Sequence, residues 1–426
     1  MVWEWIYTKG FPVGSAQIEK VLGPTSLTLS RNAFSEVLLP YGVNFYQIFI
    51  PDLMQEGESV CYAIRPGTVQ GLNHHNDVSG QKKLAARDYK DLLQCSIPCF
   101  DGLFPEEDNH IVIDTLFDFT LWHALVKSRM HTDSSLYAFK TIFNLLTYKF
   151  HLLGDYYWTI PQFGTTDSYS TQIEHHWINE KEPLPPANPE DQYQMSASQH
   201  YPLDLHSWLV ENQDDLAIVD FIPKLNDHIL PYDDPTPEQR SYLHITNNRI
   251  YLHKVLHINY TTYNIHQDQN SINPHTHSDV MVLANETTST HPYWYAHIIG
   301  IFHAEACYHD PNGSLEDSWP FNVNFLWVCW YGFDGKHWSG FRAKWPHWVG
   351  FVQGEDPEVF GFLDPSDIIQ GTHLLPVYRL GQTQDVLLLL IAHHPNEHDK
   401  DYECYTVDMW VDHDMSFCYS GLGVGH

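Results

Sequence analysis

Arginine is scarce in this chain. Of 426 residues only 8 are Arg and 14 are Lys, against 53 Asp and Glu, so the formal net charge is −31. A field of this sign repels phosphate, which disfavours electrostatic binding to DNA or RNA. Histidine, by contrast, is abundant at 29 residues. The inverted ratio of Arg to His therefore needs an explanation of its own.

Long hydrophobic runs are also missing. The longest candidate, Val386 to Ala392, has the length of a strand, so no segment predicts a membrane helix. The first residues lack the basic and apolar regions of a signal peptide. The seven cysteines are odd in number and scattered, which is typical of reduced thiols. We expect an intracellular protein, nuclear or cytoplasmic, without a membrane partner.

Aromatic residues make up 14% of the chain, which excludes wholesale disorder. The pattern predicts an α+β protein with four parts: 1–60 with short helices and a strand, a helical region at 61–180, Pro-rich linkers with short helices at 181–240, and a β-rich domain at 241–426. Within the helical region the expected helices begin near Lys82 and end before Pro98, run from Asn109 to Lys127, and cover Ser135 to Phe150.

The β-rich domain is predicted to form a closed or nearly closed barrel, because its short strands are separated by Gly, Pro and Asp turns. Asn247-Asn248 lies between two β-branched triplets and predicts a hairpin. Further strands are expected at Asp279–Leu283, Tyr293–Phe302, Phe321–Trp330, Trp348–Val352, His373–Val377, Val386–Ala392 and Cys404–Val411.

One sequence pattern has the ligand types of a metal site. On a strand, His275, His277 and Asp279 would share a face, and imidazoles with a carboxylate suit Zn or Fe. The alternative is chance, since 29 His generate such spacings and no Glu is placed as a base. A His/Asp metal-dependent enzyme therefore stands as an alternative function.

Two further carboxylates lie where phosphoryl-transfer enzymes place metal ligands. Asp52 follows the predicted strand 44–50, and Glu174 lies at a plausible helix start. The simpler interpretation of Asp52 is an aspartate that opens a turn.

Several longer strings resemble a known group of proteins. They are Leu27–Ser35, Phe45-Tyr46 with Pro51–Met54, Lys83–Tyr89, Asp91–Cys95, Tyr260–Tyr263, His291–Ala296 and Phe360–Pro365. These strings resemble the C-terminal half of proteins encoded by CACTA-type DNA transposons of mushroom-forming fungi, of the Plavaka- or KDZ-like kind.

The resemblance implies a remnant RNase H-like core that once cut DNA with Mg²⁺. Asp52 matches the second acid of an Asp-x-x-His motif, although Gln55 stands where His is expected, and Glu174 matches the final acid. The first acid would lie before Met1, and the segment 57–81 is shorter than expected. Because two-metal chemistry needs all its carboxylates, we expect a degenerate protein without catalytic activity and without a cofactor.

The C-terminal strands are similar in order to a bromo-adjacent-homology barrel, a module that binds chromatin or other protein partners. Trp294, Trp327, Trp330 and Tyr331 would then line an aromatic pocket for a peptide or a methyl-lysine. Core packing explains the same four residues equally well.

The resemblance also offers an origin for the lack of arginine. Where it leads us to expect Arg, this chain has His297, Cys329, His413 and His176-Trp177. Deamination of methylated CpG converts Arg codons to His, Cys or Trp codons, so the inverted ratio fits decay of a silenced element. Coding DNA without CpG depletion would contradict this hypothesis.

Overall fold

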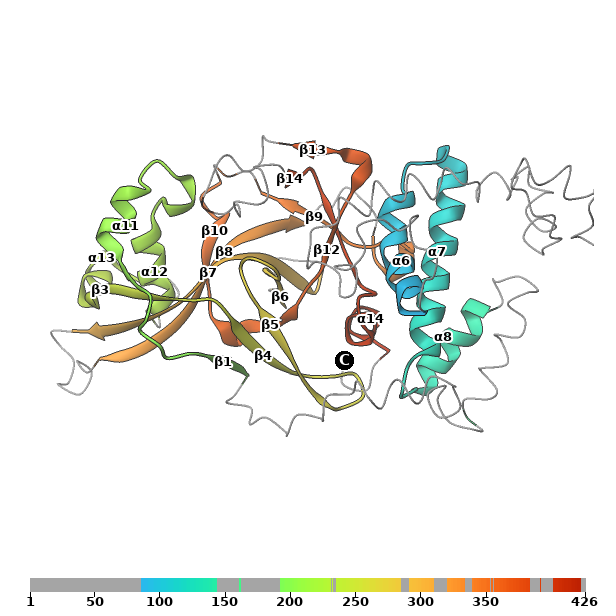
Figure 1. Ribbon diagram of the computed structural model, residues 1–426, viewed down its shortest axis with the longest axis horizontal. Helices are drawn as coiled ribbons and strands as arrows, with labels where there is room; N and C mark the ends of the chain where they lie inside the picture. The colour runs from blue at the N-terminus through green and yellow to red at the C-terminus, as the bar shows by residue number, and fades with distance from the viewer. Residues whose placement is uncertain are drawn as a thin grey trace, which may run out of the picture.

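The computed structural model describes residues 86–143, 161, 192–230, 232, 235–284, 291–309, 320–333, 339–352, 354, 356–383, 391 and 401–422. In these parts the chain is α+β, with three helices first and a mostly β region after them (Figure 1). No helix in these parts is both long and apolar enough to cross a bilayer.

The three leading helices are α6 (Ala86–Phe100), α7 (Glu106–Val126) and α8 (Asp133–Phe143). The predictions for α7 and α8 are confirmed where the structure describes them. Helix α7 begins earlier than expected, directly after Pro105. Its first turn contains three acidic residues, whose negative charges interact favourably with the positive end of the helix dipole. The expected end of α6 before Pro98 is wrong, because the helix continues through this proline for its last residues.

The β region contains fifteen strands within the described residues. They are β1 (Tyr193–Met195), β2 (Pro202–Asp204), β3 (Leu243–His253), β4 (Leu256–Thr261), β5 (Gln267–Ile272), β6 (Asp279–Leu283), β7 (Tyr293–Tyr308), β8 (Phe321–Phe333), β9 (Trp348–Phe351), β10 (Phe360–Leu363), β11 (Ile368–Gly371), β12 (Leu374–Pro376), β13 (Gln382–Thr383), β14 (Asp401–Tyr402) and β15 (Tyr405–Val407).

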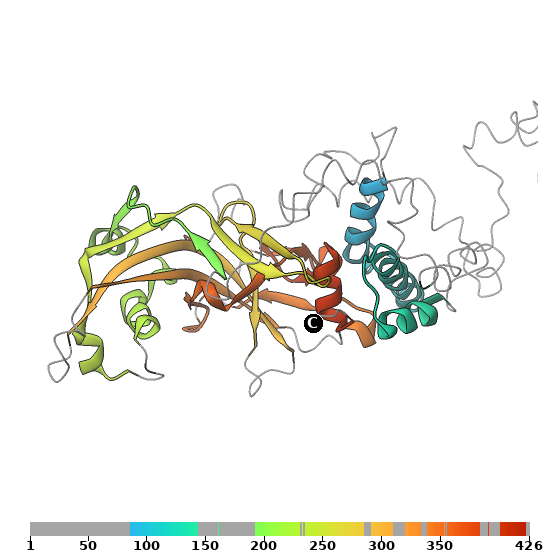
Figure 2. The same ribbon diagram turned by 90° about the horizontal axis from the view of Figure 1, so that it is seen from below.

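Ten of these strands form one sheet that curls into a half-barrel around the long strands β7 and β8 (Figure 2). Its main order is β11-β6-β7-β8-β9-β15-β12, with β10 beside β8, β3 beside β7 and β2 beside β3. A second sheet, β1-β4-β5, is separate. The predicted closure of the barrel is therefore not seen in the described part of the chain, where the sheet ends at β11 and β12.

The predicted hairpin at Asn247-Asn248 is wrong. Both asparagines do have positive φ, 57° and 54°, as a tight hairpin turn would require. However, Ile245 and Ile250, on either side, both pair with β7, opposite Ala306 and Ala304. The asparagines thus belong to a bulge within one strand, and the chain continues along β7 in the same direction.

Three helices cover one face of the curled sheet at the end remote from α6–α8: α11 (Leu205–Glu211), α12 (Phe221–Ile229) and α13 (Pro237–Tyr242) (Figure 1). Phe221 of α12 packs edge-on against Trp327 of β8, with 5.4 Å between the ring centroids. Lys224 Nζ donates to the carbonyl of Phe360 at 2.8 Å and so fixes α12 to β10. The described residues of the stretch predicted as linkers with short helices, 192–230 and 235–240, therefore pack as part of the β-rich unit.

The opposite face of the sheet is covered by β1, β4 and β5. Their inward side chains, including Leu256, Ile258 and Ile272, are fully or almost fully buried against Val280 and Val328 of the large sheet. Because a strand alternates its side chains, neighbouring residues of β8 enter two different cores. The large sheet is thus the middle layer of the β region.

Helices α6 and α7 lie at the end of the β region, next to the C-terminal helix α14 (His413–Ser420) (Figure 1). Phe117 packs edge-on against Trp410 at 5.1 Å between centroids. Two ion pairs cross the same interface: Lys344 Nζ lies 2.6 Å from Asp118 Oδ2, and Arg379 Nε lies 3.3 Å from Asp101 Oδ2. Both carboxylates are buried, so two of the few cations in the chain neutralise acids at this contact.

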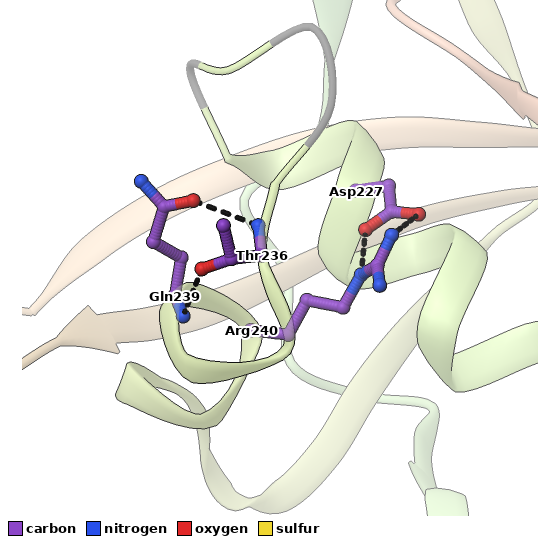
Figure 3. Close-up of polar contacts among 4 residues, drawn as sticks. All are labelled: Asp227, Thr236, Gln239 and Arg240. Carbon is purple, nitrogen blue, oxygen red and sulfur yellow. Dashed lines mark hydrogen bonds and ion pairs between the residues drawn. The ribbon is translucent and has the colours of Figure 1, made fainter.

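Replacing Lys344 by Met is expected to lower the free energy of unfolding by about 2 kcal/mol, because the buried Asp118 loses its cation while the aliphatic packing remains. The matched control is Arg240→Met. The Arg240–Asp227 pair is more exposed and lies beside the capping box formed by Thr236 and Gln239 (Figure 3). Its loss should cost about 1 kcal/mol or less. Urea denaturation of both variants measures the two values; equal losses would contradict the assignment.

Candidate functional site

Asp52 and Glu174, which the sequence resemblance predicts to be vestigial catalytic acids, lie outside the described residues. Their proximity and their role therefore stay predictions.

The predicted metal ligands do not share one strand face. Strand β6 begins only at Asp279, and His275 lies in a turn closed by the bridge between Asn273 and His277. His277 stacks on His373, with centroids 4.7 Å apart, and its Nδ1 is 3.2 Å from the carbonyl of Ser271. The shared face that a strand through these residues would give is not formed, because His275 lies within the turn that His277 closes.

Asp279 instead takes part in a buried network. Its Oδ1 lies 2.8 Å from His297 Nδ1 and accepts a hydrogen bond from the Tyr331 hydroxyl at 2.9 Å. Ser278 Oγ is also near His297 Nδ1, at 3.2 Å. Over the described ranges, no group of three or more His, Cys, Asp or Glu residues is placed to hold a metal ion. The carboxylate of Asp279 thus has protein partners on β7 and β8.

A cysteine lies in register with this network across the sheet. Asp279, His297 and Cys329 lie directly opposite one another on β6, β7 and β8. These are the residue types of a thiol hydrolase, but Cys329 is fully buried, and burial together with nearby Asp401 and Asp279 raises the pKa of its thiol. A thiol that stays protonated is a poor nucleophile. The polar links between the strands are the contact of Asp279 with His297, which joins β6 to β7, and its hydrogen bond from Tyr331, which joins β6 to β8.

The four predicted binding aromatics, Trp294 on β7 and the other three on β8, are divided between the two faces of the large sheet. Trp327 is buried against Trp208 and Phe221. Tyr331 stacks on Phe351 at 4.5 Å and donates to Asp279. Both point into the core, as alternation along a strand requires, and the single aromatic pocket expected from four residues is not formed.

Trp294 and Trp330 remain together on the other face. Their indoles are perpendicular, with an interplanar angle of 76° and 6.1 Å between centroids, and 40% of Trp294 is exposed. The indole of Trp330 lies over Gly361 of β10, where a Cβ would come within 3.2 Å of Nε1. The missing side chain at Gly361 therefore makes room for Trp330, and the pair forms a partly exposed aromatic site that we call the tryptophan ledge.

Searches of family models, curated proteins and solved structures found no match to this chain. The function is therefore argued from the geometry of the residues.

Proposed function

We propose that this chain is a transposon-derived protein without catalytic activity whose β-rich region binds basic protein segments, such as the lysine-rich tails of chromatin proteins, through the tryptophan ledge. The observation that carries the proposal is the exposure of Trp294, near the start of β7, beside Trp330 of β8. An exposed indole pair offers apolar area and a ring face to a ligand.

Charge favours a cationic partner. The formal net charge of −31 attracts Lys and Arg side chains at long range and speeds their encounter with the surface. At short range a lysine ammonium, methylated or not, gains energy over the face of a tryptophan. The same charge repels phosphate, so the proposal concerns the protein part of chromatin and not its DNA.

The proposed loss of catalysis has two supports. The first is the family resemblance of the sequence, which provides only Asp52 and Glu174 as matches to the acids of the ancestral site. The second is that Asp279, His297 and Cys329 are all buried, so this row presents no exposed nucleophile.

Replacing Trp294 by Ala is expected to lower the affinity for a fluorescent lysine-rich peptide about tenfold, because a cation over an indole and its apolar contacts contribute roughly 1–2 kcal/mol. Fluorescence anisotropy at low salt measures the change. The matched control is Phe321→Ala, since Phe321 is also 40% exposed but lies at the other end of the long strands.

Circular dichroism should show that both variants keep the native fold. Unchanged affinity in the Trp294 variant, or an equal loss in the Phe321 variant, would contradict the ledge as the binding site. Lower affinity at higher salt is expected from the charge.

A further inference from the structure

An open pocket of about 550 Å³ lies between the segment that joins β1 to β2 and the turn that joins β3 to β4. Every polar side chain of its lining can donate a hydrogen bond: Gln194, Ser196, Ser198, Tyr201, His253, Lys254 and His257. No Asp or Glu is among its lining residues within the described parts of the chain. The whole chain has 53 acidic residues against 22 Lys and Arg, so a pocket lined by a lysine and by no acidic residue has the opposite balance of charge.

The two serine hydroxyls are held as donors. Ser196 Oγ accepts from the backbone N–H of Ser198 at 3.1 Å, and Ser198 Oγ accepts from the N–H of His200 at 3.3 Å. A hydroxyl whose oxygen accepts in this way still has its own hydrogen to give. The loop from β1 to β2 therefore presents two O–H groups with fixed oxygens.

Two basic side chains complete the lining. His257 lies opposite Gln194 on β1 and Ser271 on β5, and its Nδ1 contacts Ser271 Oγ at 3.0 Å, which leaves Nε2 for a ligand. Lys254 Nζ is 5.4 Å from the centroid of the Tyr201 ring. No carboxylate in the described part of the chain lies within ion-pair distance of this ammonium group.

The wall of the pocket beneath these donors is rigid. His253 Nε2 is 2.6 Å from His303 Nδ1, and the His303 ring stacks on Tyr251 at 4.8 Å. Burial lowers the pKa of both imidazoles, and the hydrogen bond between them holds the two rings together. The backbone N–H of Leu252 also donates to the carbonyl of Tyr201 at 3.0 Å, which fixes one side of the pocket to the other.

We propose that this pocket binds the phosphate group of a small phosphate monoester. A phosphate group has three terminal oxygens that accept several hydrogen bonds at once, which fits an ammonium, an imidazole, two hydroxyls and an amide better than a carboxylate does. The negative field of the rest of the chain opposes entry of any anion, so binding depends on these short-range donors.

The test uses the full chain with inorganic phosphate as the probe, at pH 7 and low ionic strength, by isothermal titration calorimetry. Saturable binding is expected, weakened about tenfold by Lys254→Met, since a hydrogen bond to a charged group is lost. The matched control is Arg249→Met, which removes one positive charge from the exposed part of β3 outside the pocket lining and should change the affinity less than twofold.

A second arm replaces phosphate by acetate, which should bind at least about tenfold more weakly because it offers fewer acceptor sites. Ser196→Ala gives an independent check, since it removes one donor without altering the charge, and it should weaken phosphate but not acetate. Absence of saturable phosphate binding, equal losses in the Lys254 and Arg249 variants, or equal affinity for acetate would each overturn the proposal.

Discussion

Replacing Asp279 by Ala should lower the free energy of unfolding by about 3–5 kcal/mol. The side chain accepts from Tyr331 and contacts His297 inside the sheet, where neither partner can turn to water. Without the carboxylate, the His297 ring and the Tyr331 hydroxyl each lose a hydrogen-bond partner while they stay buried. Each buried polar group without its partner lowers the stability by about 1–3 kcal/mol. A loss of this size is a large share of the stability of an ordinary domain. Urea denaturation followed by far-UV circular dichroism measures it.

Two milder substitutions distinguish loss of the hydrogen bonds from loss of side-chain volume as the cause of the destabilisation. Asp279→Asn keeps an oxygen that accepts from Tyr331, so it should cost less than the alanine variant. Tyr331→Phe removes one hydroxyl while the contact between Asp279 and His297 remains, and should cost about 1 kcal/mol. If Asp279→Ala costs less than Tyr331→Phe, the row does not stabilise the sheet.

Local pattern was enough to predict the strands of this network. Strand β6 is observed with the predicted bounds, and β7 and β8 begin at the predicted residues and extend further. Helix α7 was likewise recognisable from its apolar residues. In each case the signal is a property of neighbouring residues along the chain.

The pairing and register of the strands could not be predicted from local sequence pattern in the same way. The positive φ of Asn247 and Asn248 fits a hairpin turn and a bulge equally, and only the partner strand β7 decides between them. The same holds for the row of Asp279, His297 and Cys329, whose members are 18 and 32 positions apart and meet through register alone.

One part of the aromatic prediction could have been corrected from the sequence. Trp327 and Trp330 are three positions apart on one strand, and alternation places them on opposite faces. They could therefore not line one pocket. Which of the two faces is exposed depends on α11, α12 and the second sheet, and their positions follow from long-range packing.

A buried histidine in contact with a half-buried one should make the fold sensitive to acid. The rings of His291 and His347 lie 4.2 Å apart between centroids. His291 Nε2 contacts the Tyr295 hydroxyl at 3.0 Å, and His347 Nδ1 contacts Ser339 Oγ at 3.2 Å. Burial lowers the pKa of His291 to about 3, helped by the neighbouring His347, and burial alone lowers the pKa of His347 to about 4.

The direction in which the free energy of unfolding changes with pH follows from the number of protons that each state binds. In the unfolded chain both rings titrate near 6.5, so between pH 6.5 and about 4 the unfolded state binds more protons than the folded state. The free energy of unfolding therefore falls as the pH is lowered, by up to about 1.4 kcal/mol per pH unit for each ring. Asp414 acts in the opposite direction: burial raises its pKa to about 7, so acidification through that value favours the folded state.

The variant His347→Phe isolates the pair, because it keeps a ring in the same place and removes one titrating group. Between pH 6.5 and 4.5 the unfolding free energy of this variant should fall less steeply than that of the parent, by about 1.4 kcal/mol per pH unit. His275→Phe, in an exposed turn, is the control and should keep the parent slope. Urea titrations at half-unit pH steps give the three slopes. If His347→Phe has the slope of the parent, then acid sensitivity arises elsewhere and the two rings do not stay neutral in the folded protein.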